Sequence, residues 1–546
     1  MFKDMYNNFF KYVPEKEYTF NVTENSNSKN DDLISYSSFD ESQKKISTNL
    51  NINLDFMKVK FNFLINSDIV FREFIINVKG KQYSAFLVYV DGMVRHELMD
   101  EFVIRPLMMR NQNNLFKGYQ NKFNLANYIK TSLIPQNALK KVDTFVEAIN
   151  GINSGNCALF IDTLDIAFDI EMKGFSQRAI SKPSNEVVIK GPHEAFVENL
   201  RTNTSMVRRV VNNENLVVEN IEVGDITKTR CALMYIANIT SDDLIAEVKY
   251  RLNNLSIDSL LSAGQLEQLI TDDDNMSLPQ LLTTERPDKA SNYLLNGRVI
   301  IIVNGSPYSL IIPAVLSDFL STPDEKNLRP AFANFIKIIR MISAFLTLLL
   351  PGLYVAITGF HQELFPSELL FSILASRTNV PFPVIIEILL LEVSFELIRE
   401  AGLRVPSPIG PTIGIVGALV LGQAAVSAGI ISPILIIIVA ITGIASFAIP
   451  DFSFGFQLRI SRFVFILLGF LGGFLGIGLG IFVYLSLLAN TKSFGISYTL
   501  GLTPFERVEG NKYFLPPIWK RESRANFLNS KKPQKQKHIS MNWKYK

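Results

Sequence analysis

The sequence predicts an α/β region of two related subdomains, followed by an α-helical domain that spans a membrane several times. Three observations support this fold class. The chain of 546 residues is too long for one hydrophobic core. Strand and helix patterns alternate from residue 54 to 322. Between residues 405 and 491 only Asp451, Arg459 and Arg462 are charged, whereas the chain average of 19% would give about 17 charged residues. Lipid requires such a depletion of charge, so the sequence excludes a purely soluble protein.

Residues 1–54 are expected to form a disordered polar arm. After a short stretch that contains aromatic residues, the arm is rich in Asn and Ser. This composition buries too little apolar surface to offset the entropy that the chain loses on ordering. A phosphorylated or partner-binding tail is the alternative interpretation.

The region that follows is predicted to contain pairs of strands with helices between them. The predicted strand pairs cover 72–90, 157–172 and 299–315, and the predicted helices cover 192–211 and 242–254. β-Branched and aromatic residues are enriched in the strand pairs. The first pair turns at Lys79-Gly80-Lys81. A Gly-Pro step starts the first helix, and Ser241 caps the second.

A faint internal repeat divides this cytosolic region into two related subdomains, 55–185 and 186–322. Leu87-Val-Tyr-Val90 corresponds to Leu233-Met-Tyr-Ile236 at an offset of 146 residues. The same offset pairs Glu101 with Glu247. Similarity at a constant offset indicates a duplicated structural unit.

The cytosolic region lacks a recognisable catalytic or cofactor-binding motif. Cys157 and Cys231 lie in predicted strands and are expected to be small buried hydrophobic residues. The four histidines form no HExxH motif or close metal pair, and no phosphate-binding glycine loop follows a strand. We therefore expect no metal, no cofactor, no nucleic-acid partner and no enzymatic activity.

Residues 335–492 are predicted to form a helical membrane domain with five or six crossings. The predicted spans are 341–360, 383–399, 411–430, 433–449 and 463–490, and a surface or re-entrant helix covers 366–377. Twenty residues of helix are about 30 Å long, the thickness of one bilayer core. Pro351-Gly352 predicts a kink in the first span, and Ser432-Pro433 a break before the fourth. The last apolar stretch is either one tilted span or a tight hairpin.

Basic residues set the expected orientation. Lys337 and Arg340 precede the first span, which places the N-terminal region in the cytoplasm. Arg459 and Arg462 fit a cytoplasmic loop before the last apolar stretch. Residues 493–546 form a basic C-terminal tail, expected on the same side near anionic lipid. Five spans would place this tail outside, so a sixth crossing or a re-entrant loop is needed.

Carboxylates within the apolar helices are the candidate ion pathway. Glu392 and Glu396 share one helix face with Glu400, whereas Glu387 lies about 140° away. A carboxylate that faces lipid costs several kcal/mol, so these groups must face protein, water or a cation. Several subunits around a pore would form a ring of carboxylates. In the alternative interpretation, Glu396 pairs with Arg399, and Glu387 interacts with the positive end of its helix dipole.

Three other polar groups have both a functional and a structural interpretation. Gln423 lines the ion path or joins closely packed helices. Arg201, Arg208 and Arg209 bind an acidic partner or form a solvated basic face. The segment Glu285-Arg286-Pro287-Asp288 is expected to be a loop or a helix cap.

Several blocks of the chain together resemble the A subunits of the GerA family of spore germinant receptors. The blocks are 201–209 (RTNTSMVRR), 284–288 (TERPD), 381–387 (PFPVIIE), 392–402, 422–433 (GQAAVSAGIISP), 444–452 (IASFAIPDF) and 493–498 (SFGISY). The resemblance covers about residues 60–525. It implies an integral protein of the spore inner membrane, with its N-terminal region on the cytoplasmic (spore core) side. It also implies a transporter-like B subunit and a lipoprotein C subunit as partners, a homo-oligomer, and contact with membrane lipid.

The resemblance further implies a multimeric ion channel that releases cations when nutrient is sensed and thereby triggers germination. Two alternatives remain at this point. The first is a carrier with its binding site at helices broken at Pro351-Gly352 and Ser432-Pro433. The second is a cytosolic enzyme tethered to the membrane, which the missing catalytic motif disfavours.

Overall fold

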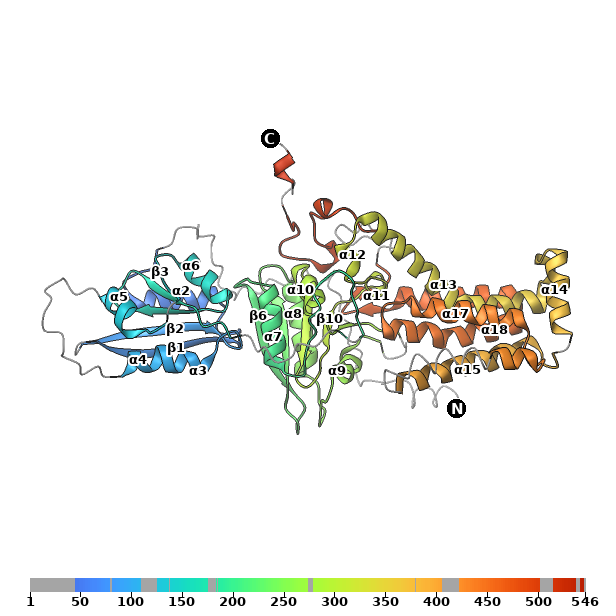
Figure 1. Cartoon of the computed structure of the whole chain (residues 1–546), viewed down its shortest axis with the longest axis horizontal. Helices are drawn as coiled ribbons and strands as arrows, with labels where there is room; N and C mark the ends of the chain where they lie inside the picture. Colours follow the sequence, from blue (N-terminus) through green and yellow to red (C-terminus); the bar gives the residue numbers. More distant parts are fainter. Residues whose placement is uncertain are drawn as a thin grey trace.

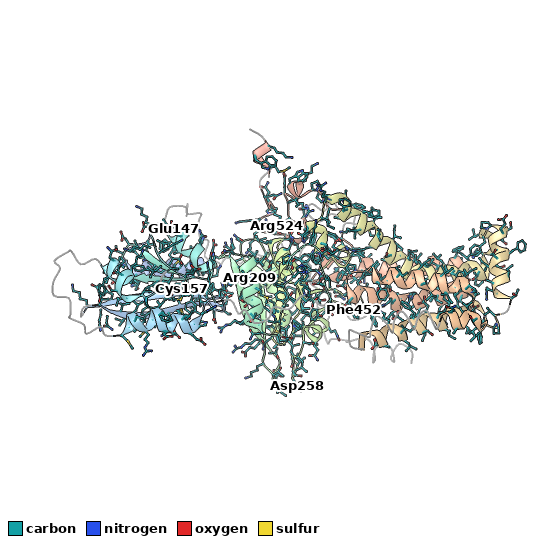
Figure 2. The ribbon with its side chains drawn as sticks, in the orientation of Figure 1. Glu147, Cys157, Arg209, Asp258, Phe452 and Arg524 are labelled. Atoms are coloured by element: carbon teal, nitrogen blue, oxygen red, sulfur yellow. The ribbon has the colours of Figure 1, made fainter. Side chains whose placement is uncertain are left out.

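The computed structural model has two sheet domains and a helical bundle in line along its long axis (Figure 1). It describes residues 45–78, 81–109, 125–136, 138–174, 183, 185–273, 278–378, 380–404, 422–500, 514–536 and 541–544. Side chains fill the spaces between the ribbons, and Phe452 lies where the bundle meets the second sheet domain (Figure 2). This arrangement agrees with the predicted order of a sheet-rich region followed by a helical one.

The first domain is built on a five-stranded sheet with the order β1-β2-β4-β5-β3. Its strands are β1 (Ile69–Val78), β2 (Lys81–Val90), β3 (Leu139–Val142), β4 (Cys157–Ile161) and β5 (Ala167–Ile170). All of its strand pairs are antiparallel. Because side chains alternate across a strand, β2 presents Leu87 to one face and Phe86 to the other. Both faces are buried, so the sheet needs a cover on each side.

Helices supply these two covers. One face is covered by α2 (Leu50–Lys60) and α6 (Phe145–Asn153). The other is covered by α3 (His96–Met99), η2 (Asp100–Ile104), α4 (Arg105–Met108), α5 (Leu125–Tyr128) and η3 (Ile129–Leu133). Cys157 is fully buried in β4, as the sequence predicts.

The second domain repeats the strand order of the first, as β6-β7-β9-β10-β8. Its strands are β6 (Leu216–Val223), β7 (Thr229–Ile236), β8 (Leu282–Thr284), β9 (Val299–Val303) and β10 (Ser309–Ile312). Leu87 of β2 pairs with Leu159, and its counterpart Leu233 of β7 pairs with Ile301. The two sheets thus have the same strand order and the same register between equivalent strands, which agrees with the internal repeat seen in the sequence.

The two faces of the second sheet have different neighbours. One is covered by α8 (Asp242–Asn253) and α9 (Ala263–Ile270). The other is covered by α7 (Leu200–Val210) and α10 (Pro287–Leu295), and its core continues into the helical bundle. Phe319 of α11 (Leu316–Phe319) is the link, because its ring lies 6.0 Å from that of Phe454. The second domain and the bundle therefore share one hydrophobic core.

Arginines of α7 join the two sheet domains. Arg208 is buried and donates to Asp68 and to Asn66 of the first domain, with Nη2 2.6 Å from Asp68 Oδ1. Arg201 pairs with Asp91 of the first domain, and Arg209 pairs with Glu194. Arg208 is therefore not part of a solvated basic face, whereas Arg201 is largely exposed and Arg209 partly exposed, each paired with a carboxylate.

The segment Glu285-Arg286-Pro287-Asp288 is a helix cap, as expected. Pro287 is the first residue of α10. Arg286 is fully buried, with Nη2 3.0 Å from Asp288 Oδ2 and 2.8 Å from the carbonyl oxygen of Pro192. The segment thereby fixes the chain that enters the second domain.

In the described part of the chain, the bundle contains four long helices and a short crosswise one. They are α13 (Pro330–Phe360), α15 (Val384–Arg404), α17 (Pro433–Phe447) and α18 (Phe452–Asn490), with α14 (Ser367–Arg377) across the far end (Figure 1). Two of them, α13 and α18, are long and apolar enough to cross a membrane, and α17 is apolar but shorter. The predicted break before Pro433 is present, with Ser432 as the N-cap of α17.

The helix α18 turns back on itself at Gly473. This glycine has φ 57° and ψ −137°, which is not helical. Tyr484 OH donates to Gln457 Oε1 at 2.9 Å, although the two residues are 27 positions apart. In a straight helix they would be about 40 Å apart. The last apolar stretch is thus a tight hairpin rather than one tilted span.

The helix directions bring both ends of the bundle segment to the second sheet domain. Glu387 meets Ser432, and Arg399 lies over Phe447, so α15 and α17 run in the same direction. Residues 405–421, with most of the predicted span 411–430, lie outside the described residues. Pro330 begins α13 beside the second domain, and Ser493, three residues after α18, donates to Gln280 of that domain.

Three boundaries differ from the sequence-based predictions. Residues 45–54 are not part of a disordered arm, because Ile46 is buried and α2 packs on the first sheet; residues 1–44 lie outside the described chain. The helix predicted over 192–211 begins only at Leu200, where Asn199 caps it. The described part of the C-terminal tail is folded, since β11 (Lys492–Ser493), β12 (Ile496–Ser497) and residues 514–536 pack on the second domain.

Candidate ion site in the helical bundle

Two helices of the bundle bring two glutamates and two arginines together. Glu392 and Glu396 are four residues apart on α15, and Arg459 and Arg462 are three apart on α18, so each pair lies on one helix face. Arg462 Nη2 lies 2.9 Å from Glu392 Oε2 and 3.0 Å from Glu396 Oε1. Arg459 Nε lies 3.8 Å from Glu396 Oε1. We call these four residues the bundle charge cluster.

Three members of the bundle charge cluster are buried and incompletely hydrogen-bonded, whereas Glu396 is partly exposed. Glu392 and Arg462 are fully buried, and Arg459 nearly so. Neither oxygen of Glu392 accepts a hydrogen bond, because its contact with Arg462 is close but poorly aligned. Nε and Nη1 of both arginines also lack hydrogen-bond partners in the described chain. Buried polar groups of this kind are normally satisfied by water or by an ion.

Arg399 adds a third positive charge near the cluster. Its guanidinium lies over the ring of Phe447, 5.1 Å from the centroid, and its Nη1 is buried without a hydrogen-bond partner in the described chain. The alternative in which Glu396 pairs with Arg399 is not what the structure shows, because Glu396 contacts Arg462 and Arg459 instead. The two carboxylates are therefore engaged by arginines.

Glu387 belongs to a different group at the far end of α15. It is buried, and its Oε1 lies 3.1 Å from Nη2 of Arg377 at the end of α14. Its Oε2 accepts the backbone N–H of Ser432 at 3.0 Å. Glu387 thus ties α14 and the start of α17 to α15.

Gln423 does not join either group. Its side chain is exposed in the described chain, and it precedes the turn to α17. The structure therefore brings together two of the four predicted ion-pathway residues, Glu392 and Glu396, and places Glu387 and Gln423 elsewhere.

The arginine partners were missed from the sequence. Arg459 and Arg462 were expected in a cytoplasmic loop, but they lie within α18 and are buried. The prediction was wrong because charged residues were expected to be exposed to water. These two arginines are buried, and glutamates of another helix neutralise them. The signal that would have found them is the i,i+3 arginine pair opposite an i,i+4 glutamate pair, in two otherwise apolar helices.

The structure does not support a solute site at Pro351-Gly352. The helix α13 continues through Pro351. A Cβ atom on Gly352 would lie 2.6 Å from the backbone oxygen of Phe465, and one on Gly469 would lie 2.5 Å from the oxygen of Gly352. The glycines thus allow α13 and α18 to touch backbone to backbone, which leaves no space for a ligand.

The described residues contain no group of three metal-ligating side chains. Burial raises the pKa of both Cys157 and Cys231 to about 12, so these thiols stay protonated and unreactive.

Comparison with known proteins identifies the family. The sequence model described as "Bacillus/Clostridium GerA spore germination protein" matches residues 56–527. The chain belongs to the GerA family of spore germination proteins. The resemblance inferred from the sequence blocks is thereby confirmed.

Two relatives of this GerA-family chain and one solved structure are similar to it over long segments. Spore germination protein KA of Bacillus subtilis (strain 168) is 40% identical over 466 residues, 85% of this chain and 84% of that protein. The uncharacterized membrane protein YfkQ of the same strain is 36% identical over 480 residues, 88% and 91% of the two chains. The crystal structure of the N-terminal domain of the A subunit of the Bacillus megaterium spore germinant receptor GerK3 is 31% identical and has a TM-score of 0.39. It covers 50% of this chain and 98% of its own.

Proposed function

We propose that this GerA-family chain is the A subunit of a nutrient germinant receptor, and that several copies form an ion channel in the spore inner membrane. Opening of the channel upon nutrient sensing releases cations and triggers germination. A transporter-like B subunit and a lipoprotein C subunit complete the receptor. The observation that carries the proposal is the bundle charge cluster: four charged side chains inside apolar helices, three of which (Glu392, Arg459 and Arg462) are incompletely hydrogen-bonded.

The membrane position of the bundle is supported by its surface. Large apolar side chains are exposed on the outside of α17 and α18, among them Ile444, Phe447, Leu471, Leu475 and Phe482. Such a surface needs lipid or a neighbouring apolar surface. Lipid on one side and further copies of this chain on another would cover it. The sheet domains then lie together on the cytoplasmic side.

The bundle charge cluster suggests how the channel stays closed. In a single chain, Arg462 contacts both carboxylates of the cluster, Glu392 and Glu396. Loss of one partner from a buried ion pair costs about 3–5 kcal/mol, because the other charge is left uncompensated. A shift of α15 relative to α18 would break these ion pairs and would therefore need an interaction that compensates the separated charges. Water or a cation that enters the bundle can provide it. In the closed channel the arginines neutralise the two carboxylates, and ions take the place of the arginines when the helices move.

Glutamine substitutions in the cluster test this proposal. In spores, Glu392→Gln and Glu396→Gln should each change the rate of ion release on nutrient addition by more than tenfold. A change of 1.4 kcal/mol between closed and open states is already tenfold, and the broken pair has more than that available. Ion release is measured in the medium, and subunit abundance by immunoblot. Glu368→Gln, at an exposed glutamate of α14, is the matched control. Normal release from both cluster variants would remove the carboxylates from the mechanism.

A further inference from the structure

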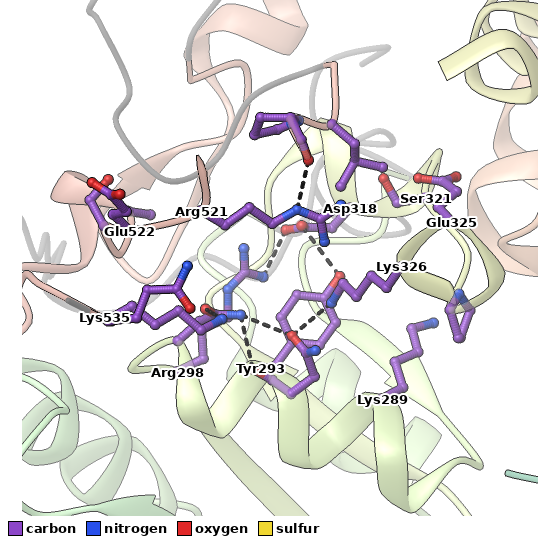
Figure 3. Close-up of a pocket in the computed structure, with 18 of the residues that line it drawn as sticks. Lys289, Tyr293, Arg298, Asp318, Ser321, Glu325, Lys326, Arg521, Glu522 and Lys535 are labelled. Carbon is purple, nitrogen blue, oxygen red and sulfur yellow. Dashed lines mark hydrogen bonds and ion pairs between the residues drawn. The ribbon is translucent and has the colours of Figure 1, made fainter. Parts of the chain in front are cut away.

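A basic cavity lies between the second sheet domain, the base of α13 and the C-terminal segment 514–536 (Figure 3). Its volume is about 870 Å³, within the range of small-molecule sites. Seven basic and four acidic side chains line it: Lys289, Arg298, Lys326, Lys337, Lys520, Arg521 and Lys535 against Asp288, Asp318, Glu325 and Glu522. The cavity is distinct from the bundle charge cluster.

Three of the four acids are already committed to arginines. Asp318 Oδ2 lies 2.7 Å from Arg298 Nη1 and also accepts the backbone N–H of Val315. Glu325 pairs with Arg340, and Asp288 pairs with Arg286, neither of which lines the cavity. Arginines therefore neutralise most of the negative charge of these three acids, and little of it is available to the lysines of the cavity.

Three cations of the cavity have only neutral hydrogen-bond partners among the described residues. Lys326 Nζ lies 2.7 Å from the side-chain oxygen of Asn292, and Lys535 Nζ lies 3.1 Å from that of Asn296. Arg521 Nε donates to the carbonyl oxygen of Pro516 at 2.9 Å, and its Nη2 is buried without a hydrogen-bond partner. Figure 3 shows Arg521, Lys326 and Lys535 around one space.

These cations destabilise one another. Burial lowers the pKa of Lys326 to about 7; Lys535, Arg298 and Lys289 act in the same direction, and Asp318 opposes them. Burial also lowers the pKa of Lys535, and the positive charges of Arg524 and Arg521 contribute. Positive charges that repel each other in a partly enclosed site are stabilised by a multivalent anion.

We propose that this cavity binds a phosphate-bearing anion, which holds the C-terminal segment against the second sheet domain. The forked guanidinium of Arg521 and the point charges of Lys326 and Lys535 suit the tetrahedral oxygens of a phosphate group. The group belongs to a soluble small molecule or to an anionic lipid headgroup. Both sources fit the position, because Lys337 lines the cavity four residues before the apolar run of α13 begins at Met341.

The site is suited to influence the bundle. It contacts α13 through Lys337, and α13 carries the apolar run that packs along α18. A bound anion would fix the base of α13 and the C-terminal segment relative to the second domain. The inference does not depend on the proposed channel, since it concerns residues outside the bundle charge cluster.

Equilibrium dialysis with labelled inorganic phosphate tests the site on the full chain in phosphatidylcholine nanodiscs. Wild-type protein should bind phosphate saturably, and Lys326→Gln and Arg521→Gln should each weaken binding by at least about tenfold, which is about 1.4 kcal/mol. Lys531→Gln is the matched control, because Lys531 of the same segment pairs with Asp242 outside the cavity. This variant should bind within about twofold of wild type. Absence of saturable binding by wild type, or equal binding by all variants, would overturn the proposal.

The pH dependence and the lipid dependence sharpen the test. Sulfate keeps two charges between pH 6 and 8, so its affinity reports on the protein alone. Because Lys326 loses its proton near pH 7, sulfate should bind about tenfold more weakly at pH 8 than at pH 6, and Lys326→Gln should remove this difference. An unchanged affinity in wild type would contradict the assignment. In phosphatidylglycerol nanodiscs, loss of phosphate binding identifies a lipid headgroup as the occupant, and retained binding identifies a soluble anion.

Discussion

At the scale of single residues, buried arginines connect parts of the chain that are far apart in sequence. Arg208 joins the two sheet domains, Arg286 fixes the entry to the second, and Arg462 joins α15 to α18. Each is almost fully buried, and each lies close to a carboxylate. A buried arginine is tolerated only with such partners, so loss of one partner is costly.

Removal of Arg208 should destabilise the junction of the sheet domains. Arg208→Ala leaves Asp68 buried without its cation, at a cost of about 3–5 kcal/mol. The control is Arg230→Ala, because Arg230 and Glu222 form an exposed pair at 3.5 Å that contributes at most about 1 kcal/mol. Thermal unfolding of the full chain in detergent should show a fall of several degrees for the first variant and little change for the second. Equal melting temperatures would contradict the structural role of Arg208.

At the scale of elements, glycines decide how the bundle helices approach and turn. Gly352 and Gly469 allow contact between the backbones of α13 and α18, and Gly473 reverses α18. Neighbouring glycines in the Gly-rich stretch of α18 have different roles. Nothing lies within 4 Å of a Cβ atom placed on Gly472, whereas one on Gly473 would lie 2.9 Å from the His361 ring.

Alanine substitutions at these two adjacent glycines should therefore differ. Gly473→Ala forces a side chain into a conformation with positive φ, at a cost of about 1–3 kcal/mol, and crowds His361. Gly472→Ala lies in open space and should leave stability unchanged or slightly raised. The protein yield from membranes and the melting temperature in detergent should fall only for the first. A straight α18 would instead leave both variants equally stable.

At the scale of the whole molecule, the sheet domains and the C-terminal segment lie at the same end of the bundle (Figure 1). Residues 514–536 pack on the second domain, and α14 lies at the opposite end. If the bundle spans a membrane, the number of crossings is even. In that case the last apolar stretch would cross twice, and a basic tail on the inside would be consistent with the predicted spans.

Cysteine labelling should confirm this arrangement. Asp225→Cys in the second domain and Lys532→Cys in the C-terminal segment are exposed and should react with an impermeant maleimide from the same side of sealed vesicles. Glu368→Cys, on α14, should react only from the other side. The native thiols of Cys157 and Cys231 are buried, and burial raises the pKa of each to about 12, so they give little background. Labelling of Asp225→Cys and Lys532→Cys from opposite sides would exclude an even number of crossings.

Much of the fold was predictable from local patterns. The structure has the predicted strand pairs, the start of α8 after Ser241 and the start of α17 at Pro433, which follow from propensity and turn residues, although the Ser241 side chain makes no capping hydrogen bond. The helix over 192–211 was predicted too long because periodicity does not show that residues 192–199 make tertiary contacts instead of helical ones. One such contact is the hydrogen bond from the Phe196 N–H to the Glu285 oxygen.

The candidate site was only half predictable. Glu392 and Glu396 stood out because carboxylates are rare in apolar helices. Their partner Arg462 did not, because 66 residues separate it from Glu396 and no local pattern links two helices over that distance. Glu387 was grouped with them because it lies on the same helix, yet its partners, Arg377 and Ser432, belong to other elements.

The amino-acid sequence alone determined that this protein has strand-rich and apolar helical parts, that part of it is duplicated, and that it belongs to the GerA family. These properties depend on amino-acid composition, on the spacing of apolar residues and on short sequence blocks. All three are local features of the sequence. Only the tertiary structure decided which acids meet which arginines, where α18 turns back, and that the C-terminal segment closes a basic cavity. Such contacts join residues that are tens to hundreds of positions apart, and their free energies depend on burial that arises only when the whole chain has packed.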